Sequence, residues 1–230
     1  MALDMTALRQ QFAKKENNGG EGGNNNYYPF WQMDTGKNAT VRFIPDLNQD
    51  NPFSFLIKKM THELKIGDEV KKVPCLKQYD AQADCPICKA SAAAYKSEGK
   101  DTVTGKALYR KLQYVGQVLV IADPLPTEAG VPSPHQGTVK IVSMGPKIYD
   151  SIKDSFESGE LEVDPSDYHE GTNFQIKRTQ SGEYADYSRS KFVNRPSPLT
   201  EAEIEIATAA QVDLSTLLPA KPEYAKVEEL

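Results

Sequence analysis

A histidine and all three cysteines of the chain fall close together in the sequence. They are His62, Cys75, Cys85 and Cys88, and the last two enclose Pro86-Ile87 in a Cys-x-x-Cys knuckle. A knuckle with one more cysteine and a histidine upstream supplies four nitrogen and sulfur ligands for tetrahedral zinc. The spacing therefore predicts one zinc ion that ties the middle of the chain together. The alternative is three idle thiols beside an unrelated histidine, and the clustering of every cysteine disfavours it.

The ligand count indicates a structural metal. Four protein ligands close the coordination sphere, so the ion would contribute folding free energy instead of chemistry. A zinc deaminase carries His-x-Glu and Pro-Cys-x-x-Cys, whereas Glu63 follows His62 directly here and Pro86 lies inside the knuckle. The thioredoxin-like pattern expected around a redox knuckle is also missing from the sequence. We find no nucleotide-phosphate loop or Ser/His/Asp arrangement, and we expect no enzymatic activity.

The composition and the first residues argue against a membrane-spanning protein and against a secreted one. Of the 230 residues 39% are apolar, and no apolar run is long enough to predict a membrane helix. The first residues lack the basic start and apolar stretch of a secretory signal, so we expect a reducing, cytoplasmic compartment.

Charge is distributed unevenly along the chain, whose net charge is −5. Fourteen basic and nine acidic residues lie between Lys37 and Lys111, whereas eight acidic residues and one basic residue lie between Asp150 and Glu170. Net acidity argues against a simple nucleic-acid binder. A basic half beside acidic segments can still carry a positive groove.

Hydrophobic periodicity predicts many short strands and a few helices. Strands are expected at 39–45, 53–58, 69–73, 113–122 and 136–144, a hairpin at 172–179 and 183–188, and helices at 89–97, 146–158 and 199–210. This order favours a fold that is mostly β with α insertions.

Three segments are expected along the chain. Residues 1–26 combine a short amphipathic pattern with a Gly/Asn-rich linker, which is typical of a flexible arm. Residues 27–195 form the globular core, with the zinc subdomain at about 58–110. Residues 196–230 form a C-terminal helix and, from Leu217, an acidic tail.

Aromatic and basic residues recur side by side. The chain has 11 tyrosines, and several adjoin bases, as in Tyr95-Lys96, Tyr109-Arg110-Lys111-x-x-Tyr114 and Tyr184-x-x-Tyr187-x-Arg189-x-Lys191. Aromatic faces stack on the bases of single strands, and lysine and arginine follow the phosphates. Any one of these tyrosines could instead pack on a sheet, so the recurrence carries the signal.

Further motifs occur in the order of a known family. They are Val41-Arg42-Phe43-Ile44-Pro45, Arg110-Lys111-x-x-Tyr114, Leu119-Val120-x-x-Asp123-Pro124, Gly145-x-Lys147-Ile148-x-Asp150, Gly171-x-Asn173-Phe174 and Tyr187-x-x-Ser190-Lys191-Phe192. With the zinc pattern, they resemble the single-stranded DNA-binding (helix-destabilising) proteins of T-even-type bacteriophages over roughly residues 27–195.

The resemblance implies an OB-fold, a five-stranded barrel-like core, with an inserted structural-zinc subdomain beside an aromatic and basic cleft for single-stranded DNA. By the same resemblance the cleft residues include Arg42, Arg110, Lys111, Tyr114, Tyr184 and Tyr187. Lys147, from the quoted Gly145-x-Lys147 motif, is a further candidate. Tyr79, Tyr95 and Tyr109 would stand in for family aromatics that do not align near the knuckle. Arg189 and Lys191 complete the candidate DNA-binding set from the last aromatic and basic cluster.

Two departures from the family concern the chain ends. The family's arm carries a compact basic cluster that drives cooperative binding, whereas this arm offers Arg9 and Lys14-Lys15. The family's long acidic tail recruits replication and recombination proteins, and here only a modest acidic stretch runs from Glu201 to Glu229. By the resemblance, other copies of the chain along the strand and replication and recombination proteins are still the expected protein partners.

The leading hypothesis is a non-enzymatic protein that coats and protects single-stranded DNA without sequence preference during phage replication, recombination and repair. The alternative is a zinc-stabilised protein interaction module or regulator without strong DNA binding. A zinc enzyme would require an open coordination position.

Overall fold

The computed structural model describes residues 26–125, 127 and 131–230. At its centre is a seven-stranded sheet with neighbours in the order β3-β2-β4-β1-β6-β9, and β5 pairs with β4 off this path. Every pairing in that sheet is antiparallel. A few helices surround it, so the predicted mainly β fold with helical insertions is confirmed at that level. The arm expected at 1–26, with Arg9, Lys14 and Lys15, falls outside the described residues except for its last residue.

The elements follow one another along the chain. The strands are β1 (Asn38–Ile44), β2 (Leu56–Ile66), β3 (Glu69–Pro74), β4 (Lys111–Ala122), β5 (Val139–Met144), β6 (Phe174–Lys177), β7 (Thr179–Ser181), β8 (Tyr184–Asp186) and β9 (Lys191–Phe192). The helices are α2 (Pro86–Glu98), α3 (Val103–Leu108), α4 (Pro146–Glu157), α5 (Glu201–Ala210) and α6 (Tyr224–Glu228), with short 3-10 turns η2 (Phe30–Gln32), η3 (Leu76–Gln78) and η4 (Leu214–Leu217).

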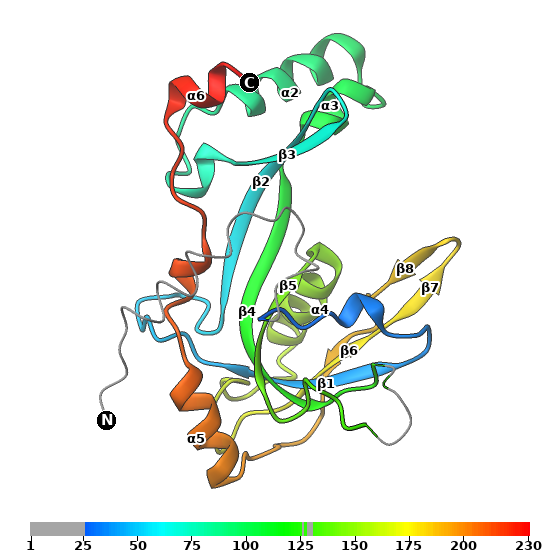
Figure 1. Cartoon of the computed structure of the whole chain (residues 1–230), viewed down its shortest axis with the longest axis vertical. Helices are drawn as coiled ribbons and strands as arrows, with labels where there is room; N and C mark the ends of the chain where they lie inside the picture. The colour runs from blue at the N-terminus through cyan, green and yellow to red at the C-terminus, as the bar shows by residue number, and fades with distance from the viewer. Residues whose placement is uncertain (1–25, 126, 128–130) are drawn as a thin grey trace.

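Two long strands, β2 and β4, join a larger lobe to a smaller one (Figure 1). One edge of β4 pairs first with β2 and then with β1, and its other edge pairs with β5. Residues 114–120 of β4 are consequently buried throughout, as their mixed run without strict alternation predicts. Gly116 permits the close approach of β2, because a Cβ there would lie 2.8 Å from both the Leu56 Cδ2 and the Phe55 carbonyl oxygen.

The core of the larger lobe lies between the sheet and α4. The rings of Phe43 and Phe174 have centroids 5.5 Å apart, and the Phe174 and Phe192 centroids are 4.9 Å apart. Ile148 and Ile152 of α4 bury their side chains in the same cluster. Pro146 occupies the first turn of this helix, where its missing N–H leaves no hydrogen bond unmade.

The smaller lobe, residues 61–110, is called the metal lobe below. It has its own apolar cluster, in which Leu64, Val73, Leu76 and Ile87 are joined by Val227 from α6. This contact is between segments more than a hundred residues apart in the sequence.

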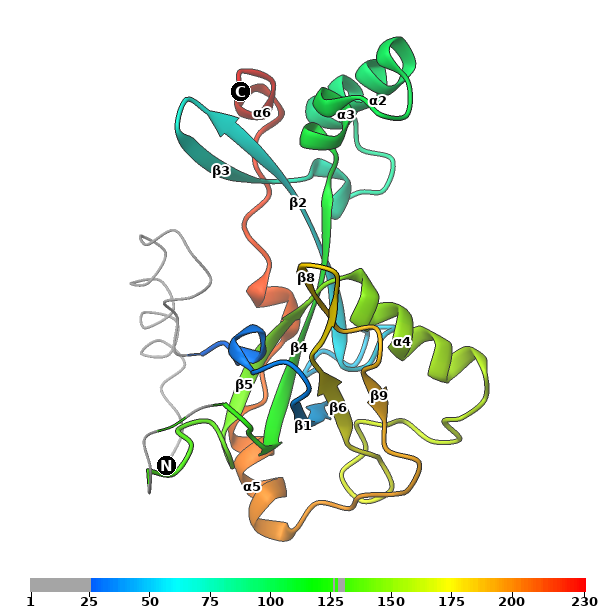
Figure 2. The same cartoon turned by 90° about the vertical axis from the view of Figure 1, so that its right-hand side faces the viewer.

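The C-terminal strap, residues 199–228, runs along one side of the molecule from α5 to the metal lobe (Figures 1 and 2). Leu199, Ala207 and Leu214 are buried along the way, and Val227 is 2% exposed. The expectation of a tail from Leu217 is therefore wrong for this segment, because its apolar side chains find partners on both lobes. Thr200 and Glu203 begin α5 with reciprocal hydrogen bonds of a capping box.

Other boundaries also differ from the sequence expectation. The strand expected at 53–58 begins at Leu56, after a turn in which the Ser54 N–H donates to the Asn51 carbonyl. The first hairpin arm, expected at 172–179, divides: β6 pairs with β1 and β9, and only β7 and β8 form the hairpin. Every second side chain of β6, Phe174 and Ile176, is buried in the core. This burial keeps β6 in the large sheet. α3 and β9 were not predicted. In the described part of the chain, no helix has the length and apolarity needed to cross a bilayer.

Candidate metal centre and nucleic-acid interface

The four predicted metal ligands meet in the metal lobe. His62 Nε2 lies 3.5 Å from Cys85 Sγ and 3.6 Å from Cys88 Sγ, and Cys75 Sγ lies 3.6 Å from Cys88 Sγ. All four donor atoms lie within 4.8 Å of one another. His62, Cys75 and Cys85 are buried and Cys88 is partly exposed.

Local structure explains how the ligands converge. His62 lies on β2 and pairs with Val73 on β3, and β3 delivers the chain to Cys75. Cys85 precedes the first turn of α2 in extended conformation, and Pro86 begins the helix. Cys88 then lies in that first turn, so both knuckle sulfurs face the strand pair.

The geometry fits a tetrahedral metal ion. With metal–sulfur bonds of about 2.3 Å and a metal–nitrogen bond of about 2.0 Å, tetrahedral ligand atoms stand roughly 3.5–3.8 Å apart. Three of the six separations, 3.5 to 3.6 Å, lie at the lower edge of this range, and the remaining pairs of donor atoms lie within 4.8 Å. A disulfide would require sulfurs about 2 Å apart, and all three cysteines are free.

The His62 ring is set up as a ligand by its other nitrogen. Nδ1 lies 2.9 Å from the Leu108 carbonyl oxygen, which can only accept, so Nδ1 carries the proton and Nε2 faces the sulfurs with its lone pair. Burial lowers the pKa of His62, which favours the neutral ring that a metal needs.

The thiols differ in how readily they ionise. Burial raises the pKa of the Cys75 thiol to about 12, so a cation at the centre is required to hold it as a thiolate. Burial also acts against the Cys85 thiolate, but hydrogen bonds from the Cys88 and Leu76 backbone N–H groups outweigh it and lower the Cys85 pKa. Burial raises the pKa of Cys88, and the charge of the Cys85 thiolate adds to that rise.

Tyr109, Arg110 and Lys111, three of the predicted DNA-contacting residues, lie together where α3 leads into β4. A fourth, Tyr95, adjoins them from α2. The rings of Tyr95 and Tyr109 meet edge to face with centroids 6.3 Å apart. The Arg110 guanidinium lies 5.8 Å from the Tyr109 ring centroid. Tyr109 is 49% exposed and Lys111 is exposed. Aromatic faces and cations are thus presented next to the metal centre.

Tyr114 lies further along β4 and is largely covered. Its ring stacks on Tyr149 of α4 with centroids 3.6 Å apart and an interplanar angle of 2°. Lys58 of β2 is the cross-strand partner of Tyr114, which places the exposed Lys58 side chain on the same face. Lys58 and Tyr149 were not among the predicted residues. Tyr149 follows Lys147-Ile148 in a motif quoted for the family, so its position alone could have drawn attention to it.

The β7–β8 hairpin presents Tyr184, which is 78% exposed. Lys147 of α4 anchors this hairpin through a 2.7 Å ion pair with Asp186. Because of this ion pair, less of the positive charge of Lys147 is available to a phosphate. The Lys147 ammonium and the Ser188 hydroxyl together lower the pKa of Asp186 to about 2.

Arg189 and Lys191 border a polar hollow of about 430 Å³, together with Lys177. Its other lining residues are neutral: Asn38, Gln175, Ser188 and Ser190. No carboxylate lines this cationic hollow, and no ion pair of Lys177, Arg189 or Lys191 is seen among the described residues. Lys177 was not among the predicted residues, since a lone lysine ending a strand carries no signal in the sequence.

Arg42 does not reach this surface. The side chain is 0% exposed, and its guanidinium donates to Asn173 Oδ1 at 3.1 Å and to the Asp167 carbonyl at 2.8 Å. Further bonds run to the carbonyls of Gly171 and Ser197. The structure thus corrects its placement in a cleft: four acceptors occupy Arg42, which ties a loop to the sheet.

Tyr79 and Tyr187 also have structural partners. The Tyr79 hydroxyl donates to the Pro219 carbonyl at 2.6 Å, which joins the metal lobe to the C-terminal strap. Tyr187 is half-buried and packs edge to face on Phe30 with centroids 5.4 Å apart. These two rings are less available for stacking than Tyr109 and Tyr184.

The fold and the site define a mainly β protein in which a lobe with one histidine and three cysteines that could hold a metal ion adjoins exposed aromatic and basic side chains. A family model described as gp32 DNA binding protein like matches residues 35–230. The chain therefore belongs to this family, as the sequence motifs predicted.

Two curated relatives are single-stranded DNA-binding proteins of bacteriophages. The chain is 29% identical over 202 residues to the single-stranded DNA-binding protein of Enterobacteria phage T4, an alignment covering 84% of this chain and 63% of that protein. The single-stranded DNA-binding protein of Enterobacteria phage T2 matches with the same identity and coverage. The alignment thus spans less than two thirds of the length of these relatives.

Proposed function

We propose that this protein binds single-stranded DNA without sequence preference and has no enzymatic activity. The observation that carries the proposal is the cationic hollow, in which Lys177, Arg189 and Lys191 gather without a carboxylate. Binding that ignores sequence is chiefly electrostatic, because cations release the counterions condensed on phosphates. The family membership supports the same function.

Exposed rings supply the second component. Tyr184 and Tyr109 are the most exposed of the candidate aromatics, and each has a basic residue within a few positions of the chain. Stacking of one base on an aromatic side chain contributes about 1–3 kcal/mol and tolerates every base. The proposed contact set is therefore Tyr95, Tyr109, Arg110, Lys111, Lys147, Tyr184, Arg189 and Lys191, to which Lys58 and Lys177 are added. Tyr114 is left out because its ring is stacked on Tyr149.

The sheet supports a finer proposal about the fold. β4 pairs with β2, β1 and β5, and such sharing of a long strand is compatible with an OB-fold core into which the metal lobe is inserted between β2 and β4.

Zinc is the proposed metal, because three thiolates and one imidazole are the donor set that it prefers. When bound, it would supply a structural cross-link. Three thiolates around a divalent ion leave one negative charge, and Arg110 beside Cys88 neutralises it. Arg110 would thus serve both the metal centre and the adjoining DNA surface.

By analogy with the phage relatives, the proposed setting is phage DNA replication, recombination and repair in the cytoplasm of the infected bacterium. Other copies of the chain along the strand, and replication proteins that bind its acidic C-terminal segment, are the proposed protein partners.

The test is a fluorescence titration of the full chain with oligothymidylate at several salt concentrations. Log affinity should fall linearly with log salt, and Arg189→Met and Lys191→Met should each reduce the slope by about 0.7. Tyr184→Ala should weaken binding about 5- to 150-fold without changing the slope, since one stacked base contributes about 1–3 kcal/mol.

Lys221→Met is the matched control, because Lys221 is exposed on the C-terminal strap away from the hollow. It should leave affinity and slope unchanged. Absence of binding at low salt, or a slope that no variant alters, would contradict the proposal and favour the alternative of an interaction module without strong DNA binding.

A further inference from the structure

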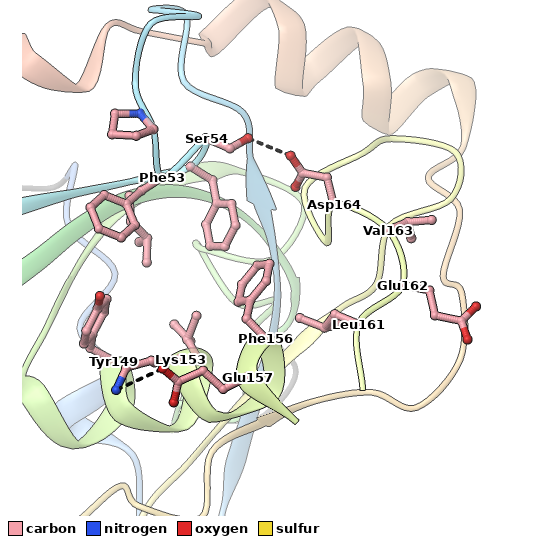
Figure 3. A pocket seen from close by; sticks show the side chains of 14 residues that line it. Phe53, Ser54, Tyr149, Lys153, Phe156, Glu157, Leu161, Glu162, Val163 and Asp164 are labelled. Carbon is pink, nitrogen blue, oxygen red and sulfur yellow. Dashed lines mark hydrogen bonds and ion pairs between the residues drawn. The ribbon is translucent and has the colours of Figure 1, made fainter. Parts of the chain in front are cut away.

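A second concavity lies on the side of α4 that faces the acidic loop at residues 160–164. Its volume is about 500 Å³ (Figure 3), within the range of roughly 300–1,000 Å³ typical of ligand pockets. Most of its lining is apolar, from Phe53, Phe55, Tyr149, Ile152, Phe156 and Leu161. Phe53 and Phe156 point into it from opposite walls (Figure 3).

The apolar surface of this pocket is incompletely covered. Phe53 is 51% exposed, Phe156 47% and Val163 43%. The Phe55 and Phe156 rings stack with centroids 6.3 Å apart, and Phe53 meets Tyr149 at 6.5 Å. Contiguous exposed apolar side chains with polar surroundings are typical of an interaction site.

The rim is acidic. Glu157, Glu162 and Asp164 line the pocket, and Lys153 is its only base. Lys153 is already paired with Glu157 at 3.2 Å. Between Asp150 and Glu170 eight acidic residues accompany that single lysine. A phosphate backbone would be repelled here, in contrast to the cationic hollow.

Side-chain hydrogen bonds tie two parts of the pocket rim together. Ser54 adopts a φ of +56°, in the left-handed region that a non-glycine residue seldom enters. Its hydroxyl donates to Asp164 Oδ2 at 2.7 Å, and the Ser166 hydroxyl donates to Asp164 Oδ1 at 2.6 Å. These bonds join the loop before β2 to the acidic loop. Backbone strain at a single residue of a pocket rim is typical of binding sites.

We propose that this pocket docks a segment of a partner protein in which one or two large apolar side chains adjoin lysine or arginine. The apolar anchors would enter between Phe53 and Phe156, and the basic side chains would meet Glu162 and compete with Lys153 for Glu157. Charge complementarity selects this occupant, because the pocket favours apolar groups and its rim favours cations. The inference goes beyond DNA binding and uses a surface from which DNA is repelled.

The probe is a fluorescein-labelled peptide, Lys-Lys-Leu-Phe-Lys-Lys with blocked ends, titrated into the full chain without DNA and followed by anisotropy. Saturable binding is expected, at least tenfold weaker when glutamate replaces the lysines or serine replaces Leu-Phe. Amide chemical shifts should move at residues 53–56 and 149–164.

Two variants locate the site. Phe156→Ser should weaken the peptide at least tenfold, and Glu162→Lys, a surface change that leaves the apolar packing intact, at least threefold at low salt. The matched controls are Val103→Ser, at a side chain 82% exposed on α3, and Glu69→Lys, at an exposed residue of β3. Neither control should alter binding, and far-UV circular dichroism melts should confirm that all four variants fold.

Three results would overturn the proposal. Equal peptide affinity for all variants would place binding elsewhere. Weaker oligothymidylate binding by Phe156→Ser would assign the pocket to the DNA interface. Displacement of the probe by a peptide of residues 1–16, or self-association of the full chain that Phe156→Ser abolishes, would make the chain itself the occupant.

Discussion

Replacement of Arg42 tests whether this residue acts on the fold or on DNA. In the structure its guanidinium donates hydrogen bonds to Asn173 Oδ1 and to the carbonyls of Asp167, Gly171 and Ser197. Burial lowers the pKa of Arg42 to about 10, so the group remains charged at neutral pH. Arg42→Met keeps the apolar stem of the side chain and removes the charged fork.

The expected cost follows from the acceptors left behind. Each buried acceptor without a partner costs about 1–3 kcal/mol, and these costs are not additive. Removal of one partner from a buried charged network costs about 3–5 kcal/mol, and we expect a loss of that size. A domain is stable by only about 5–15 kcal/mol, so the variant should melt about 6–20 °C lower, at roughly 2–4 °C per kcal/mol.

The assay is urea unfolding followed by far-UV circular dichroism, with thermal melts and oligothymidylate titrations on the same samples. Arg42→Lys should also destabilise the protein, because an ammonium cannot reproduce the planar fork. Arg189→Met is the matched control, since Arg189 is exposed and lines the cationic hollow. It should leave the free energy of unfolding unchanged and reduce the salt dependence of DNA binding.

One pattern of results would refute this reasoning. If Arg42→Met unfolds within about 1 kcal/mol of the parent chain, yet reduces both DNA affinity and its salt slope, Arg42 reaches DNA in solution. The hydrogen bonds seen here would then be only one state of the side chain.

Three further predictions concern the metal, the sheet and a titration. Chelation should remove the metal and lower thermal stability, with faster amide exchange first in the metal lobe; an unchanged melt after verified removal would contradict a structural role. Gly116→Ala should destabilise the protein by about 1–3 kcal/mol in urea unfolding, because its Cβ would lie 2.8 Å from the Phe55 carbonyl oxygen, which cannot move freely; wild-type stability would mean that β2 shifts without cost. Asp186 should titrate at about 2 by carboxyl NMR, below its ordinary value of about 3.9. A depressed folded-state pKa stabilises the fold at higher pH and loses that effect as pH falls towards 2, and Lys147→Met should raise the pKa towards normal. An unaltered Asp186 pKa in that variant would exclude Lys147 as a cause.

The metal centre was predictable from the sequence because few residue types bind such ions and their spacing is local. Cys85 and Cys88 are one helical turn apart, and the only other cysteine, Cys75, lies within reach of the same strand pair. The strands β1, β4 and β5 were also predictable, since their apolar residues end at turn residues, and β3 was predictable from the turn at Gly67-Asp68 that precedes it. Tyr184, Arg189 and Lys191 were proposed from a local cluster of aromatic and basic residues, and their role in DNA binding stays a prediction.

The positions of the remaining site residues depend on contacts between distant segments. Arg42 and its acceptors in the 167–173 loop and at Ser197 are separated by 125 to 155 residues in the chain. No local pattern distinguishes an arginine that is buried by such a loop from one that faces solvent. Lys58 and Tyr149 likewise become neighbours of Tyr114 only through strand register and the packing of α4.

The kinds of side chain present follow from the amino-acid order: a donor set of one imidazole and three thiols, a mainly β chain, and many aromatic and basic side chains. Which of these side chains are free to act depends on the folded arrangement. It buried Arg42, covered Tyr114 with Tyr149, fixed the C-terminal strap to the metal lobe, and separated a cationic hollow from an apolar pocket with an acidic rim. The physical reason is that burial and charge pairing are properties of neighbours in space, which local periodicity does not encode.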